Sequence, residues 1–305
     1  MKEKIKKIMK QVKERLRVMS DNGINPVWTV LSVVCIVIAV AGVIWNINER
    51  WKRQQAQDVY EKIVIEMQGE TETVESTAET PHVPEDAAEA SNQETENQTV
   101  EKAEVPVDPY EKKLDFSKLQ TSVESNIYAW IYIPDTKIDY PILQHPQDNN
   151  YYLTHNLNGS KGYPGCIYTE NYNSKDFTDQ NTVIYGHNMK NGTMFGGMHL
   201  FKDKGYAEMH PYVYIYLPEK MYIYEVYAAY EYGDEHLLAN QESRNGRGDE
   251  KEFSDAQNAA NSNGYYKEGI EITEESNIVT LSTCISDKKE KRFLVQAVLK
   301  DVVDR

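Results

Sequence analysis

The chain has 305 residues, a formal net charge of −15 and three cysteines. This length allows one or two ordinary domains. The charge is unevenly spread: residues 1–20 carry 8 basic and 2 acidic groups, whereas residues 66–104 carry 12 acidic groups and one lysine. Because an acidic chain repels polyanions, the composition argues against a nucleic-acid partner.

An uncharged, strongly apolar stretch follows the basic tail at residues 27–45. As a helix it would extend about 28 Å, close to the thickness of a hydrocarbon core. Trp28 and Trp45 lie near its ends as interfacial anchors do, and the basic tail favours a cytoplasmic N-terminus. We therefore predict a cytoplasmic tail over 1–26 and a transmembrane anchor over 27–47. The protein would be a single-pass protein of the cell membrane, with its remainder extracytoplasmic.

A cleaved signal peptide is the alternative interpretation of this stretch. The apolar core of a signal peptide is short, and a small-residue cleavage site follows it. Here the uncharged run is long, and Ala39-Val40-Ala41 lies inside it. The sequence therefore favours an uncleaved anchor.

Residues 48–107 are predicted to form an acidic extracytoplasmic linker. Its first part, to about residue 67, mixes charged and apolar residues as a short helix would. From 68 to 107 the chain is rich in Glu, Thr, Asn and Pro and has no aromatic residue. Such a composition buries too little apolar surface to offset chain entropy, so we expect a disordered, extended stalk.

The remainder, residues 108–305, is predicted to be one folded domain. Phe116, Leu119, Val123 and Ile127 recur at helical spacing and indicate an entry helix. Runs of β-forming residues then alternate with turn signals, and a further helix is expected near 254–261. The expected strands are 129–134, 138–143, 163–169, 181–186, 212–217, 221–226, 277–283 and 293–299. This pattern is typical of a mainly β fold, a barrel or sandwich with helical decorations. Alternation in 212–226 also predicts one partly wet face made of tyrosines.

Cys284 ends one apolar run, and Arg292 begins the next after a short polar stretch at 285–291. Two strands joined by a short loop most simply form an antiparallel hairpin. The hairpin would place the thiol beside the guanidinium. A cation favours the thiolate form of a cysteine, and a fixed donor stabilises the oxyanion of acyl transfer. Either need could be met by Arg292.

His187 is the candidate acid or base. It follows the strand-like run 181–185 and Gly186, so its imidazole is expected at a strand end. Side chains at the ends of three strands can share one rim of a barrel or sheet, where rigid folds present chemistry. The other histidines lie in the stalk or beside polar turns and are expected to be solvated. No group of them has metal-ligand spacing, so the sequence predicts no metal and no cofactor.

A disulfide between Cys166 and Cys284 is the structural alternative, since Cys35 lies in the predicted anchor. Disulfide scaffolds usually have more bridges in a smaller domain. Cys166 could equally be a small buried strand residue.

Together these blocks resemble the sortase family, and within it class B. They cover about residues 110–303 in the family's order: WIYIPDTKIDYPI at 130–142, DNNYYL at 148–153, NTVIYGHNM at 181–189, and TLSTC at 280–284 with Arg292. Three features depart from the family pattern: Asp135 at a turn, the additional thiol of Cys166, and the long acidic stalk.

The resemblance implies an eight-stranded β-barrel with N-terminal helices and a helix between the sixth and seventh strands. It implies a membrane-anchored cysteine transpeptidase of Gram-positive bacteria. Such an enzyme cleaves a C-terminal sorting signal of an exported protein and transfers the protein to an amine of the cell-wall precursor.

In that reading Cys284 forms a thioester acyl-enzyme. His187 moves the protons, and Arg292 stabilises the oxyanion. By family position, the peptide groove would include Asn149, Leu153, Ser282 and Thr283, and ordinary barrel packing is the alternative role for these four.

Three other functions stay open on the sequence. A pilin lysine could replace the wall amine as acceptor. A peptidoglycan L,D-transpeptidase would have a glycine before its cysteine, whereas Thr283 stands there. A non-catalytic, stalked wall-surface binding protein would tolerate replacement of Cys284 and Arg292.

Overall fold

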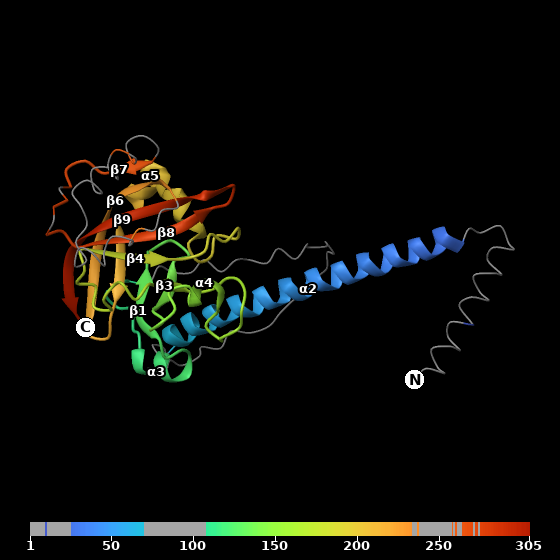
Figure 1. The fold of residues 1–305 in the computed structure, drawn as a ribbon. Coiled ribbons are helices and arrows are strands. Elements are labelled where there is room, and N and C mark those ends of the chain that lie inside the picture. Colours follow the sequence, from blue (N-terminus) through green and yellow to red (C-terminus); the bar gives the residue numbers. More distant parts are fainter. Residues whose placement is uncertain are drawn as a thin grey trace, which may run out of the picture. The chain divides into compact units, whose positions relative to one another are not determined.

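The structure is a computed structural model that describes residues 10, 26–69, 108–233, 237, 258, 260, 264–270, 272–273 and 275–305 (Figure 1). It contains two compact units, Met1–Gln55 and Ala56–Arg305. The expected disordered stalk over 68–107 lies almost entirely outside the described residues.

The N-terminal helix α2 (Pro26–Gly69) is longer than the sequence predicted. The anchor and the short helix after it form one continuous helix, because no glycine or proline interrupts the chain between them. Within the described residues, one stretch of this helix, Val34–Tyr60, is long and apolar enough to cross a membrane. The large apolar side chains in the first part of this stretch, such as Ile38 and Trp45, are exposed.

Nine strands follow in the part of the chain that the structure describes. They are β1 (Ile127–Tyr132), β2 (Asp139–Leu143), β3 (Ile167–Thr169), β4 (Asn181–Tyr185), β5 (Tyr212–Tyr216), β6 (Lys220–Tyr232), β7 (Tyr265–Tyr266), β8 (Ile278–Ile285) and β9 (Lys288–Asp304). Their order is β5-β1-β2-β3-β4-β8-β9-β6, and pairing of β5 with β6 closes the ring. The predicted eight-stranded barrel is therefore confirmed, with β7 as an additional strand on β6. The pairs β2–β3 and β4–β8 are parallel.

Short helices decorate the barrel: α3 (Phe116–Ser122), α4 (Tyr151–Thr154), the 3-10 helix η1 (Gly196–Lys202) and α5 (Lys204–Met209). The Asp115 carboxylate caps α3 by accepting from the Lys118 N–H at 2.9 Å. The predicted entry helix is thus present, but it ends before Ile127, which begins β1. The helix expected near 254–261 falls mostly outside the described residues, although Asn258 and Ala260 are helical.

Apart from Tyr212, which is 39% exposed, the tyrosines at the paired ends of β5 and β6 are buried and do not form the partly wet face that the sequence suggested. Tyr216 and Tyr224 are fully buried, and Tyr214 and Tyr222 are nearly so. Segments outside the strands cover them and accept from their hydroxyls: Tyr216 donates to Pro109 O, Tyr222 to Asp176 O and Tyr224 to Asn277 Oδ1, at 3.0–3.1 Å. A tyrosine whose hydroxyl finds such a partner can be buried without loss.

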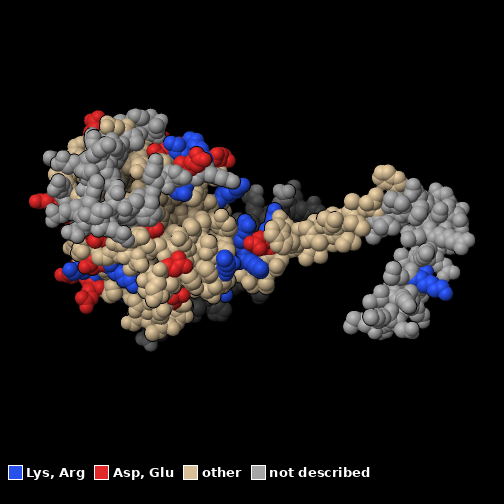
Figure 2. All heavy atoms as spheres, viewed as in Figure 1, with Lys and Arg blue, Asp and Glu red and all other residues tan. Residues whose placement is uncertain are grey.

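Charged side chains are spread over the outside of the barrel unit. Figure 2 shows acidic and basic groups interspersed on the described part of the visible face.

Candidate active site

The β8–β9 hairpin places Cys284 and Arg292 directly opposite each other as Cα partners. The predicted pairing is correct, but the predicted loop is too long. Strand β9 begins at Lys288, and the turn consists of Ser286 and Asp287 alone. Lys288 is exposed and pairs with Ile285, and a register shift between Cys284 and Ile285 separates this pair from the pair of Cys284 and Arg292. The thiol of Cys284 is exposed, and Arg292 is half-buried.

His187 reaches the same rim because β4 runs parallel to β8, with Tyr185 beside Ser282. Two hydrogen bonds continue this pairing beyond the end of β4. The Gly186 N–H donates to Ser282 O at 3.1 Å, and the Thr283 hydroxyl donates to Gly186 O at 2.7 Å. The residue before His187 is thereby joined to the residue before Cys284.

Only glycine fits at position 186. A Cβ there would lie 2.4 Å from Ile167 Cδ1 and 2.7 Å from Phe195 Cδ2, well inside van der Waals contact. The glycine before the histidine is thus explained by close packing of the β4 end against the barrel, which fixes where the imidazole begins.

The imidazole of His187 is held by backbone and by a tyrosine ring. Its Nε2 lies 2.7 Å from Leu153 O, and because a carbonyl can only accept, Nε2 carries the proton. The Tyr163 ring packs at 4.7 Å between centroids. Burial lowers the pKa of His187 below its ordinary value, and the bond to Leu153 O opposes that shift. In the neutral imidazole, Nδ1 is then the nitrogen without a proton.

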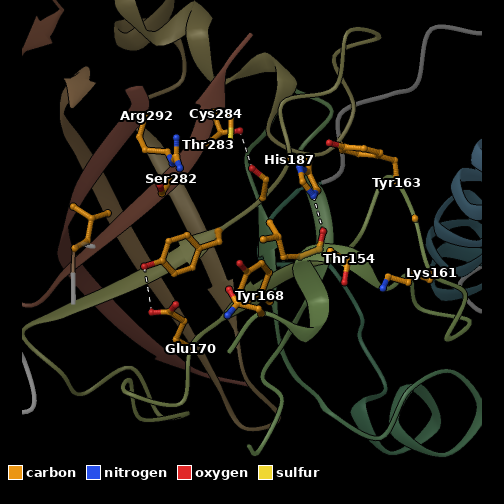
Figure 3. A pocket seen from close by; sticks show the side chains of 16 residues that line it. Thr154, Lys161, Tyr163, Tyr168, Glu170, His187, Ser282, Thr283, Cys284 and Arg292 are labelled. Atoms are coloured by element: carbon orange, nitrogen blue, oxygen red, sulfur yellow. Dashed lines mark hydrogen bonds between the residues drawn. The ribbon is translucent and has the colours of Figure 1, made fainter. Parts of the chain in front are cut away.

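The three side chains share one groove with a volume of about 560 Å³ (Figure 3). Cys284, Arg292 and Ser282 lie on one side of it, and His187 and Tyr163 on the other. The lining residues among those described are Asn150, Leu153, Thr154, Lys161, Gly162, Tyr163, Tyr168, Glu170, Tyr185, Gly186, His187, Leu237, Ser282, Thr283, Cys284 and Arg292.

Not all of the four residues expected in the groove line it in the structure. Leu153, Ser282 and Thr283 line the groove, whereas Asn149 is not part of the described lining and its neighbour Asn150 is. Asn149 Oδ1 instead accepts from the backbone N–H of Asn171 at 2.8 Å, which directs its side chain towards that loop. Loop geometry of this kind leaves no periodic signal in the sequence.

Sequence reasoning missed an aromatic and acidic part of the groove. Tyr168 and Tyr185 are paired across β3 and β4, with stacked rings 5.4 Å apart. Glu170 is buried and accepts from the Tyr185 hydroxyl at 3.4 Å. Burial and the Glu170 carboxylate both raise the pKa of Tyr185, so its hydroxyl remains a donor. The sequence signal that could have indicated this part of the groove is the tyrosine in each of two short predicted strands.

His199 is not solvated as expected. It is half-buried, and its ring lies 4.8 Å from that of Phe293. Asn188 donates from Nδ2 to the Cys284 carbonyl at 2.9 Å and lies 3.0 Å from His199 Nε2. Asn188 therefore holds the Cys284 carbonyl by a hydrogen bond, and His199 packs beside Asn188.

The three cysteines are free, so the alternative of a bridge between Cys166 and Cys284 does not hold. Cys166 is fully buried, and burial raises the pKa of its thiol to about 12. Its Sγ donates to His155 O at 3.3 Å. A thiol with such a pKa stays protonated and unreactive near neutral pH.

An exposed thiol, an imidazole and a guanidinium at one rim of a closed β-barrel define a cysteine enzyme of the acyl-transfer class. The comparisons agree. The Sortase domain matches residues 131–300, so the chain belongs to the sortase family, whose members are cysteine transpeptidases. Class B members are among its relatives.

Sortase B of Listeria monocytogenes is 33% identical over 179 residues, which cover 58% of this chain and 71% of the relative. The crystal structure of Clostridium perfringens sortase B is 29% identical with a TM-score of 0.51, covering 61% of this chain and all of the other. A Streptococcus pyogenes class B sortase involved in pilus biogenesis is 25% identical with a TM-score of 0.52, covering 61% and 98%. The protein is a class B sortase-type transpeptidase.

Proposed function

We propose that this enzyme cleaves a C-terminal sorting signal of exported proteins and transfers each protein to an amine of the cell-wall precursor. The observation that carries the proposal is the shared groove, which holds the exposed Cys284 thiol, His187 and Arg292 within a peptide-sized hollow. Its apolar walls and few convergent polar groups suit an extended peptide.

In the first half-reaction, the Cys284 thiolate attacks the carbonyl carbon of the scissile peptide bond, and a C–S bond forms. Arg292 donates to the resulting oxyanion. The tetrahedral intermediate collapses as the C–N bond breaks, and the imidazolium of His187 gives its proton to the leaving amine. The products are a thioester on Cys284 and the released C-terminal peptide.

In the second half-reaction, an amine attacks the thioester carbon while neutral His187 accepts its proton. The C–S bond breaks, and the Cys284 thiolate and the imidazolium of His187 are restored. No cofactor is needed, since each proton and leaving group is accounted for. The lowered pKa of His187 favours its neutral form near pH 7, the form required by this second step.

Leu153 and Ser282 are proposed as contacts for the bound peptide, and Thr283 as part of the groove wall. Leu153 is 38% exposed and supplies apolar surface at the mouth of the groove. Ser282 shares a strand face with Cys284 because side chains alternate along β8. Thr283 is buried with its hydroxyl committed to Gly186 O, so we assign it to the wall rather than to direct binding.

We infer the membrane arrangement from the apolar part of α2 and the charge before it. Residues 1–26 form the cytoplasmic tail, 27–47 the anchor, 48–107 the extracytoplasmic segment, whose helical residues 56–63 pack on the barrel unit, and 108–305 the rest of the catalytic domain. The uncharged part of α2 continues to Asn48, and charged residues begin at Glu49. This arrangement presents the groove to exported substrates on the outer side of the cell membrane.

A pilin-polymerising role is the second candidate. The similarity to the Streptococcus pyogenes class B sortase involved in pilus biogenesis favours it. The two roles differ in the amine that resolves the thioester, a wall-precursor amine or a pilin lysine.

The test uses the full chain in detergent micelles with C-terminal peptides of exported proteins from the same cell. Each reaction receives either a wall-precursor amine or a pilin-derived lysine peptide, and mass spectrometry identifies the joined product. We expect a product that requires Cys284, His187 and Arg292, each tested as its alanine variant. Cys35→Ala is the matched thiol control and retains activity. Equal product formation by Cys284→Ala would refute the proposal.

A further inference from the structure

The last turns of α2 pack into the core of the barrel unit. Ala56, Tyr60 and Ile63 are 2%, 4% and 5% exposed, and the ring of Tyr60 meets that of Tyr140 edge-on at 5.5 Å. Gln57 adds a hydrogen bond from Nε2 to the Thr193 hydroxyl at 3.1 Å. The sequence placed these residues in a linker and the start of the folded domain at residue 108. The contacts show that this part of the helix belongs to the folded unit.

One contact of this helix reaches the active-site wall. The buried Tyr60 hydroxyl donates to the backbone carbonyl of Gly165 at 2.7 Å. Tyr60 and Gly165 are 105 positions apart in the chain, so the bond joins the helix to a distant loop. Gly165 is held from its other side as well, since its N–H donates to Asn156 Oδ1 at 2.8 Å.

Gly165 lies against the imidazole of His187. A Cβ at this position would be 3.2 Å from His187 Cδ2, 2.8 Å from Tyr152 O and 3.1 Å from Leu153 O. Leu153 O is the acceptor that holds His187 Nε2 at 2.7 Å. The Gly165 backbone therefore lies close to both the imidazole and the carbonyl that orients it, with no room for a side chain between them.

We propose that Tyr60 is a positioning residue for transpeptidation. Its hydroxyl fixes the Gly165 loop, and through Gly165 and Leu153 it fixes the orientation of His187. Tyr60 does not line the groove within the described part of the chain, so it acts without touching substrate. The inference rests on the proposed role of His187 in proton transfer.

The consequence is that the helix carrying the apolar anchor sequence also helps to build the catalytic site. Docking of residues 56–63 orients the imidazole, so a chain in which this helix segment is loosened retains the thiol but transfers protons poorly. A structural role alone would lower stability without changing the behaviour of His187.

Tyr216 provides a matched control. It too is a buried tyrosine whose hydroxyl donates to a backbone carbonyl, Pro109 O at 3.0 Å, but it does not line the groove as described. Tyr60→Phe and Tyr216→Phe each remove one such bond. Gln57→Ala removes a half-buried side chain that holds the same helix segment. It serves as a second variant if Tyr60→Phe folds poorly.

The experiment compares the full-length wild type, Tyr60→Phe, Gln57→Ala and Tyr216→Phe in detergent micelles. Peptide cleavage gives kcat and KM, and imidazole nitrogen NMR gives the titration and tautomer of His187. Misplacement of a catalytic group by 1 Å can cost about 100-fold. We expect Tyr60→Phe to lower kcat about five- to tenfold with KM nearly unchanged and to shift the His187 resonances. Gln57→Ala should give a smaller change in the same direction, and Tyr216→Phe should change neither quantity.

Two failures are distinguishable. A wild type that forms no thioester would refute the proposed function. An active wild type with kcat and His187 resonances alike in the Tyr60, Gln57 and Tyr216 variants would overturn the positioning role alone.

Discussion

The hydroxyl of Thr283 offers a direct test of how the two reactive strand ends are joined. It donates to Gly186 O at 2.7 Å, and Thr283 is 2% exposed. Thr283→Val keeps the shape and β-branching of the side chain but removes the donor. The substitution therefore isolates one hydrogen bond between the residue before Cys284 and the residue before His187.

The expected loss of stability follows from leaving the Gly186 carbonyl without its hydrogen-bond donor. A hydrogen bond of this type contributes about 1 kcal/mol net, and leaving a buried acceptor unsatisfied costs about 1–3 kcal/mol. Because the hydrogen bond between Thr283 and Gly186 as a whole is only partly buried, we expect a loss of about 1–2 kcal/mol in the free energy of unfolding. Relaxation of Gly186 should also move His187 relative to Cys284, so kcat/KM should fall about 10- to 100-fold.

Thr280→Val is the matched control. Thr280 is fully buried in the same strand, and its hydroxyl donates to Asn181 Oδ1 at 2.8 Å, again between β8 and β4 but away from the groove. Urea unfolding and peptide-cleavage kinetics are measured for both variants. Both should lose stability, whereas only Thr283→Val should lose activity beyond the loss of folded protein. Equal specific activity in the two variants would refute the coupling of Thr283 to the site.

Two further predictions concern the same rim. Gly186→Ala should lower the free energy of unfolding by about 1–3 kcal/mol through overpacking against Ile167 and Phe195. It should also lower kcat by displacing His187. A stable, fully active variant in urea and kinetic assays would contradict the packing argument. Burial lowers the pKa values of His187 and His199 below 6.5, so the folded state binds fewer protons than the unfolded state as pH falls through that range. Stability should therefore be full above about pH 7 and decrease towards the lowered pKa values. Urea titrations at pH 8 and 5.5 should show a smaller decrease for His199→Gln than for the wild type, and an equal or larger decrease would exclude the histidine as a cause.

The positions of the three proposed catalytic residues were predictable because they follow from strand pairing. A hairpin brings the end of its first strand near the start of its second, which predicts that Cys284 and Arg292 meet, and a strand that ends in Gly-His presents an imidazole at a rim. The Cys284–Arg292 pairing is correct although the loop was predicted several residues too long, because a register shift between Cys284 and Ile285 accommodates the additional residues of β9.

The positions of the residues around them could not be predicted from strand pairing. Gly165 and Asn149 lie in irregular segments and Leu153 in the four-residue helix α4, and their contacts depend on loop geometry rather than on periodicity. The packing of Tyr60 depends on a helix that the composition assigned to a linker. The buried tyrosines of β5 and β6 show the same limit, because alternation reveals which face a side chain shares but not what covers that face.

The acyl-enzyme is the most direct test of the account. Full-length protein is incubated with sorting-signal peptides without an amine, quenched in acid and analysed by intact-mass and peptide-mapping mass spectrometry. We predict a hydroxylamine-sensitive thioester on Cys284 that is absent in Cys284→Ala and greatly reduced in His187→Ala. A fully active enzyme with no adduct on Cys284, or an adduct on Cys166 instead, would contradict the assignment of the groove as the catalytic site.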